Sequence, residues 1–173
     1  HSFPTRRPSD LVVKAFLHAF RTDYPPAEQL AIASGLIRDF GLAEELDAQD
    51  LLDLARQWAR EQTQRFRPEW VRHKDLVRWV NGDRLFERVA DVLLETSEGE
   101  IALIQRSTFR GKRKLWRNKA LELAGLFWLF RQGLRADYPD RTIRTFLHLP
   151  LEAALLEVVA TTPSEAPVQG ELF

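Results

Sequence analysis

Residues 91–99 read DVLLETSEG, and residues 101–111 read IALIQRSTFRG. Residues 92–94 and 101–104 are continuous apolar runs, which is typical of strands that are buried on both faces. The SEG sequence between them is a typical tight turn. The two stretches therefore predict a β-hairpin with strands over 85–96 and 100–106.

The residues around this hairpin predict an α/β chain. Helical spacing of apolar residues predicts helices over 10–22 and 27–40, and a third helix from an Asp47 N-cap to just before Pro68. A Trp- and Val-rich strand over 69–80 precedes the hairpin. One long helix over 114–136 and two strands over 142–149 and 153–160 follow it. We expect a mixed sheet flanked by helices, with an N-terminal helical segment.

Composition excludes several classes of protein. The 173 residues contain no Cys, which rules out disulfide frameworks, thiolate zinc sites and cysteine nucleophiles. No apolar run reaches the roughly 18 residues that a membrane span requires, so we expect no membrane partner. The 45% hydrophobic content is enough for one core, and we expect a single domain over 11–160.

The two ends of the chain call for separate interpretation. Residues 1–10 read HSFPTRRPSD and resemble a translated sequencing adapter, with Pro8 in place of Ser, so we expect a technical scar there. The alternative is a natural basic arm. Residues 161–173 have the composition of a flexible tail. The tail ends in Gln169, Leu172 and Phe173, which resemble a bacterial sliding-clamp-binding peptide; the alternative is an unstructured polar tail.

The hairpin residues resemble the nuclease domain of RecB/AddA-type helicase-nucleases, the C-terminal part of UvrD-like enzymes. That family typically reads DLLLETPEG and then IIDHKSFPG. The likeness continues through KALELAG at 119–125 and TFLHLP at 145–150, and it extends weakly back to His18. The resemblance implies a restriction-endonuclease-like, PD-(D/E)XK core.

The same resemblance implies that the nuclease site has degenerated. Active members of the family hold Mg²⁺ with two acids and use a Lys to activate water. The first acid maps onto Asp91, but the second maps onto Gln105 and the Lys onto Ser107. Gln105 offers only a neutral oxygen, and Ser107 carries no charge. Three other family positions have also changed, at Arg88, Leu126 and Phe130.

We therefore expect a vestigial, inactive site formed by His18, Asp91, Gln105 and Ser107, with no metal. If a metal binds, Asp91 and His18 are the expected ligands. Two alternatives stay open. Asp91 is a structural acid, or an acid displaced to Glu100 or Glu122 restores an active Mg²⁺-dependent DNA exonuclease.

Charge is distributed in opposed blocks, although the net charge is zero. Residues 89–105 carry four acids and no base, whereas residues 106–119 carry seven bases and no acid. The basic run follows the strand that carries the family's catalytic Lys, so we expect it to contact DNA phosphates. Trp116 within the run either stacks on a base or anchors a helix in the core. The predicted DNA contacts are Arg106, Arg110, Lys112, Arg113, Lys114, Arg117 and Lys119.

Together these features predict the inactive, DNA-binding, nuclease-like module of an AddA/RecB-like ATP-dependent helicase-exonuclease that acts in double-strand-break repair and recombination. ATP would bind only in an upstream helicase region, because these residues contain no phosphate-binding loop. The expected partners are DNA, a companion helicase-nuclease subunit and the sliding clamp, and the expected location is the bacterial cytoplasm, at the nucleoid. A stand-alone clamp-binding adaptor is the other alternative.

Overall fold

The computed structural model describes residues 7–159 and the backbone of residues 168–172. The chain divides into two compact units, His1–Gln62 and Thr63–Phe173. The region predicted as one domain over 11–160 therefore contains most of a helical unit and most of a separate sheet-containing unit.

The first unit is built from helices, as the apolar spacing predicted. They are α1 (Pro8–Ala19), α2 (Pro26–Asp39) and most of α3 (Ala48–Phe66). Asp47 caps α3 as predicted, because its Oδ1 accepts a 2.6 Å hydrogen bond from the backbone N–H of Gln49. Gly41 follows α2 with φ +69°, a backbone conformation that favours glycine. Residues 8–10, assigned to the scar, form the first turn of α1, and Asp10 is buried.

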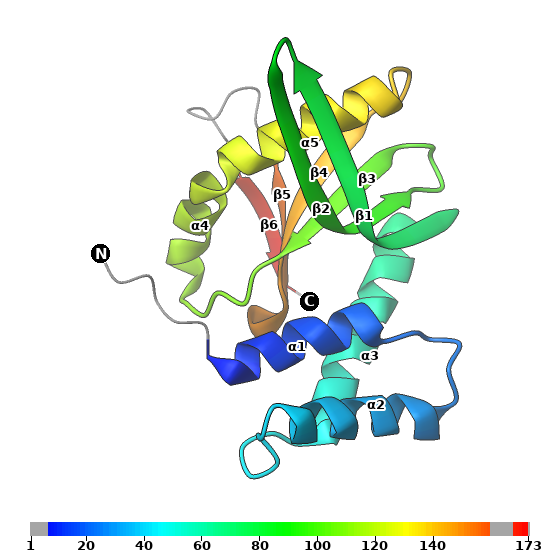
Figure 1. Ribbon diagram of the computed structural model, residues 1–173, viewed down its shortest axis with the longest axis vertical. Coiled ribbons are helices and arrows are strands. Elements are labelled where there is room, and N and C mark those ends of the chain that lie inside the picture. Colours follow the sequence, from blue (N-terminus) through cyan, green and yellow to red (C-terminus); the bar gives the residue numbers. More distant parts are fainter. Residues whose placement is uncertain (1–6, 160–167, 173) are drawn as a thin grey trace. The chain divides into compact units, whose positions relative to one another are not determined.

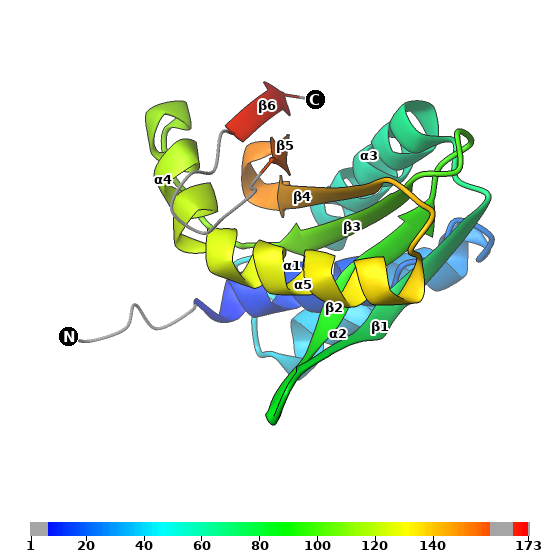
Figure 2. The ribbon, with the colours of Figure 1, turned by 90° about the horizontal axis from the view of Figure 1, so that it is seen from above.

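The second unit is organised around a mixed six-stranded sheet (Figures 1 and 2). Its strands lie side by side in sequence order, and only the β3–β4 pair is parallel. The fold is therefore α/β with a mixed sheet, as expected. The strands are β1 (Trp70–Asn81), β2 (Arg84–Glu95), β3 (Ile101–Arg106), β4 (Ile143–Leu149), β5 (Ala154–Val158) and β6 (Val168–Leu172).

The parallel β3–β4 pair needs a crossover connection, which the chain supplies as helices. The prediction of one continuous helix over 114–136 is wrong, because this region contains a 3₁₀ turn and two helices, α4 (Trp116–Glu122) and α5 (Ala124–Asp137). The break falls at Leu123, whose backbone N–H bonds to the carbonyl of Ala120 in a tightened turn. Gly125 follows and lowers the helix propensity at this point.

The main core of the second unit lies between α5 and the sheet. Phe127, Phe130 and Leu134 from α5 pack in one buried cluster with sheet residues such as Leu103 and Leu147. This packing fixes α5 on one face of the sheet (Figure 2). Within the described residues, no helix has the length and apolar character that a membrane crossing requires.

The C-terminal segment differs from its prediction. A flexible tail is predicted over 161–173, but Val168–Leu172 forms β6 and pairs antiparallel with β5. The physical reason is that β5 would otherwise expose a row of backbone N–H and C=O groups, which a short extended segment can satisfy. Gln169 and Leu172 of the predicted clamp-binding peptide lie in this strand, whereas Phe173 lies outside the described residues.

Candidate functional site

Strands β2 and β3 bring together the two positions that the resemblance maps to acidic metal ligands. The side-chain Oε1 of Gln105 accepts a 2.6 Å hydrogen bond from the backbone N–H of Asp91. The Oδ2 of Asp91 accepts a 2.7 Å bond from the backbone N–H of Arg106. Asp91 is only 6% exposed. The two side chains therefore link the adjacent strands at the point where β3 ends.

These contacts decide what the two side chains can do chemically. One carboxylate oxygen of Asp91 and the carbonyl oxygen of Gln105 already accept short bonds from backbone amides. A metal ion could take those oxygens only by breaking bonds that hold β2 to β3. In the described part of the chain, no three His, Cys, Asp or Glu side chains gather where they could hold a metal.

The other members of the predicted vestigial site have different surroundings. The backbone N–H of Ser107 donates to the carbonyl of His148 at 2.9 Å, which extends the β3–β4 pairing by one residue. The Ser107 hydroxyl accepts a 3.3 Å bond from the backbone N–H of Phe109, in a local turn. His18 is half-buried on α1, in the first unit.

The two displaced acids do not replace Gln105. Glu100 immediately precedes β3, whereas Gln105 lies near its end, so five residues of extended chain, roughly 16 Å, separate them. Glu100 lies instead 3.8 Å from Arg144. Glu122 is exposed and accepts a 3.2 Å bond from Lys119.

Arg106 is the one member of the predicted DNA-contacting set that is buried, with 5% exposure. Arg106 is therefore removed from that set, because a buried side chain does not reach DNA phosphates. It ends β3, a strand buried on both faces, and pairs in register with His148 on β4. His148 is 1% exposed. Burial lowers the pKa of His148 well below 6.5, and the nearby charge of Arg106 lowers it further.

The remaining cations lie in a segment that leaves the end of β3, residues 107–119, which we call the basic segment. Five of them are exposed. Lys119 is less exposed, because its ammonium bonds to Glu122 and lies 5.9 Å from the centre of the Phe109 ring. The five exposed cations are Arg110, Lys112, Arg113, Lys114 and Arg117. All of these except Arg110 make no ion pair with any described residue.

Trp116 holds the basic segment against the body of the unit. Trp116 is 4% exposed, and its Nε1–H donates to the carbonyl of Gly111 at 3.0 Å. The backbone N–H of Gly111 donates in turn to Glu152 at 3.1 Å. Of the two interpretations of Trp116, the core anchor is therefore correct, and the ring is not offered to a base.

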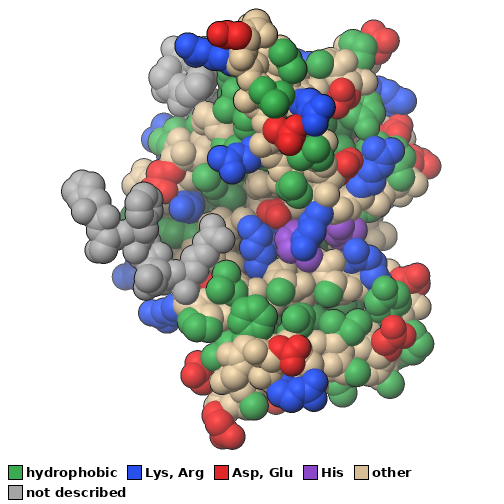
Figure 3. Space-filling view, viewed as in Figure 1, with side chains coloured by type: hydrophobic (Ala, Val, Ile, Leu, Met, Phe, Trp, Pro, Cys, Tyr) green, Lys and Arg blue, Asp and Glu red, His purple; other side chains and the backbone are tan. Residues whose placement is uncertain are grey.

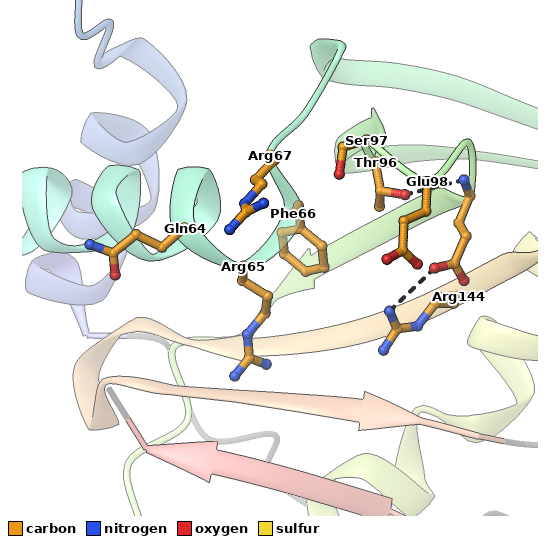
Figure 4. Close-up of a pocket in the computed structure, with 9 residues that line it drawn as sticks. Gln64, Arg65, Phe66, Arg67, Thr96, Ser97, Glu98 and Arg144 are labelled. Carbon is orange, nitrogen blue, oxygen red and sulfur yellow. Dashed lines mark hydrogen bonds and ion pairs between the residues drawn. The ribbon is translucent and has the colours of Figure 1, made fainter.

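A polar pocket of about 360 Å³ lies at the other end of the β2–β3 hairpin (Figure 4). Arg144 lines it while its Nε and Nη2 donate to the two carboxylate oxygens of Glu157, each at 2.9 Å, a bidentate pair that raises the arginine pKa. No sequence pattern indicates this pocket, because its walls come from three separate segments: the end of α3, the hairpin turn and β4. Its residues are Gln64, Arg65, Phe66, Arg67, Thr96, Ser97, Glu98, Glu100 and Arg144.

Comparisons with known proteins leave the family open. No protein-family model matches the chain. No curated protein matches it either. A solved structure titled "Crystal structure of SSO0001" is 16% identical over 98% of this chain and 69% of that chain, with a TM-score of 0.32. A TM-score this low does not show a shared fold.

Proposed function

We propose that the second unit is a nuclease-like module that binds DNA through the basic segment and does not cleave it. The observation that carries this proposal is the pair of hydrogen bonds that ties Asp91 and Gln105 into the β2–β3 pairing. The two side chains lie close together, as ligands of a shared metal would. However, their oxygens accept hydrogen bonds from backbone amides and so link the two strands.

The topology supports the assignment to a nuclease-like core. A β1–β2–β3 antiparallel meander, a helical crossover and a parallel β4 follow the element order that the resemblance implies. The position of Asp91 on β2 opposite the end of β3 is also the one expected from that resemblance. Fold alone does not determine function, so the basic segment, and not the topology, supports the DNA-binding part of the proposal.

The basic segment is suited to phosphate contacts. No acid occurs anywhere in residues 101–121, so no carboxylate within that stretch competes for its cations. Exposed Lys and Arg side chains each neutralise about one phosphate and release its counterions. The Trp116 and Gly111 contacts fix the segment at both ends of its turn, which limits the entropy lost on binding.

In the wider protein, this module would position DNA for an AddA/RecB-like ATP-dependent helicase-exonuclease whose motor lies upstream. Double-strand-break repair is the process in which such a module would act. The chemistry that the basic segment contributes is electrostatic and independent of base sequence.

Fluorescence anisotropy with labelled single- and double-stranded 30-mers tests the proposal. Replacing Arg113, Lys114 and Arg117 together by Gln should weaken binding at least tenfold at 100 mM salt, because about three phosphate contacts disappear. A matched control replaces three other exposed cations of the unit by Gln and should change binding less than twofold. The control cations are Arg84, Arg88 and Arg135.

The same samples test the absence of cleavage. The chain is incubated with each DNA and with Mg²⁺ or Mn²⁺, and no degradation above a no-protein blank is expected. Metal-dependent degradation that Asp91→Ala abolishes would overturn the inactive-site part of the proposal. Equal loss of binding in the test and control variants would overturn the assignment of the DNA surface.

A further inference from the structure

The β1–β2 hairpin extends well beyond the rest of the sheet. Strand β3 pairs with β2 only over Val92–Glu95, whereas β1 and β2 stay paired out to Asn81 and Arg84. The outer half of the hairpin is therefore a two-stranded ribbon (Figure 1). A two-stranded ribbon is at best marginally stable without packing on one of its faces.

Helix α5 supplies that packing on one face of the ribbon. Trp79 meets Trp128 edge to face with ring centroids 5.5 Å apart, and Phe86 meets Phe130 in the same way. The helix approaches β1 closely at Gly133, where an added Cβ would lie 2.7 Å from Val77. This face of the ribbon is therefore covered by α5 within the unit.

The opposite face of the ribbon is apolar and exposed. It carries Leu76 and Val80 from β1 and Leu85 and Val89 from β2, which are 48–61% exposed. Between them lies one ion pair, Arg78 to Glu87, with a 2.6 Å contact. These six residues, which we call the hairpin patch, form three cross-strand rows: Leu76–Val89, Arg78–Glu87 and Val80–Leu85.

The hairpin patch concentrates exposed apolar surface on one element. Four of the ten large hydrophobic side chains that are exposed in the described residues belong to it. Figure 3 shows hydrophobic side chains at the surface over the hairpin, with only a few charged groups among them. Exposed apolar side chains gathered on one element, here in two rows on either side of an ion pair, are typical of an interaction site.

We propose that the hairpin patch binds the hairpin patch of a second copy of this chain. The charge pattern favours a second copy as the partner, because the middle row holds one cation and one anion and is therefore complementary to itself. A two-fold interface places the same surface on both sides, so a self-complementary row is what it requires.

The same row selects the direction of the two-fold axis. An axis parallel to the strands exchanges β1 and β2 across the interface, so that Arg78 of one copy faces Glu87 of the other. Leu76 then faces Val89, and Val80 faces Leu85. An axis perpendicular to the strands would instead place Arg78 over Arg78 and Glu87 over Glu87, which is unfavourable.

The size of the patch predicts a weak dimer. Standard stable interfaces bury about 800 Å² on each partner, more than four half-exposed aliphatic side chains supply. We therefore expect a dimer that forms at micromolar concentrations and dissociates on dilution. Its formation does not depend on the proposed DNA binding, so either proposal can fail alone.

Sedimentation equilibrium of the full chain between 1 and 300 µM tests the dimer. The weight-average mass should rise from one chain toward two across this range. Arg78→Glu alone and Glu87→Arg alone should each stay monomeric, because four like charges would meet at the centre. An equimolar mixture of the two variants should recover the dimer, which a folding defect could not produce.

Disulfide cross-linking tests the predicted orientation of the two copies, since the natural chain contains no Cys that would interfere. Under mild oxidation, a mixture of Leu76→Cys and Val89→Cys chains should cross-link faster than either variant alone. Three results would overturn the proposal. The first is a mass of one chain at every concentration, and the second is a dimer that persists unchanged in both charge variants. The third is binding of a different protein to the patch of a strictly monomeric chain.

Discussion

Replacing Asp91 by Ala removes the acceptor of the 2.7 Å hydrogen bond from the backbone N–H of Arg106. The N–H belongs to a buried residue near the end of β3, where the truncated side chain leaves no oxygen to replace the carboxylate. Asp91→Asn keeps an oxygen in the same place but removes its charge. The two substitutions therefore form a graded series on one interaction.

The expected losses follow from the burial of this site. Leaving a buried amide without its acceptor costs about 1–3 kcal/mol, and hydrogen bonds to charged groups lie toward the upper end. We expect Asp91→Ala to lower the free energy of unfolding by about 2 kcal/mol and Asp91→Asn by about 1 kcal/mol. The bond from the Asp91 backbone N–H to Gln105 is unaffected by either change.

Urea unfolding followed by tryptophan fluorescence measures the effect, since four of the five tryptophans lie in the second unit. With an m-value of about 2 kcal/mol/M, the midpoint should fall by roughly 1 M for Asp91→Ala. Asp140→Ala, at an exposed position, is the control and should shift stability by less than about 0.5 kcal/mol. An acid kept for catalysis often reduces stability, so an unchanged or raised midpoint in Asp91→Ala would refute the structural role.

Further predictions concern packing and pH. Gly133→Ala should lower the free energy of unfolding by about 1–3 kcal/mol, because the new Cβ would clash with Val77. Gly125→Ala is the control: it has open space around it and should leave stability unchanged or raise it. Equal urea midpoints for the two variants would contradict the close α5–β1 contact. The lowered pKa of His148 keeps its imidazole neutral in the folded state, while the unfolded chain gains a proton near pH 6.5. The folded state should therefore lose up to about 1.4 kcal/mol per pH unit below pH 6.5, until the pH reaches the folded pKa. His148→Leu should remove this contribution between pH 7.5 and 5, and an identical pH dependence in both proteins would contradict it.

The sequence predicted the strands and most helices because local patterns determine them. The apolar runs, the Asp47 cap and the turn at Gly99 each act within a few residues, and the structure confirms the elements they predicted. The break at Leu123 was missed, since the apolar pattern continues through it. The pairing of β6 was also missed, because it depends on an edge of β5 that is offered only once the sheet has formed.

In the candidate site too, contacts set by neighbouring residues could be predicted from the sequence, and contacts set by distant elements could not. The nearness of positions 91 and 105 could be predicted from the hairpin, whose two arms must lie side by side. The burial of Arg106 could not, because it depends on which face of β3 the neighbouring elements cover. The hairpin patch was likewise invisible in the sequence, where Leu76 and Val80 are ordinary strand residues.

The slope of log Kobs for double-stranded DNA against log salt concentration is the decisive test of whether the basic segment contacts DNA phosphates. Five exposed cations in the basic segment predict a slope of about −4.5, and replacing Arg113, Lys114 and Arg117 by Gln predicts about −1.8. Between 50 and 200 mM salt, these slopes correspond to affinity losses of roughly 500-fold and 12-fold. We expect this flattening in the triple variant only. A slope near zero in the natural chain, or the same slope in both proteins, would contradict it.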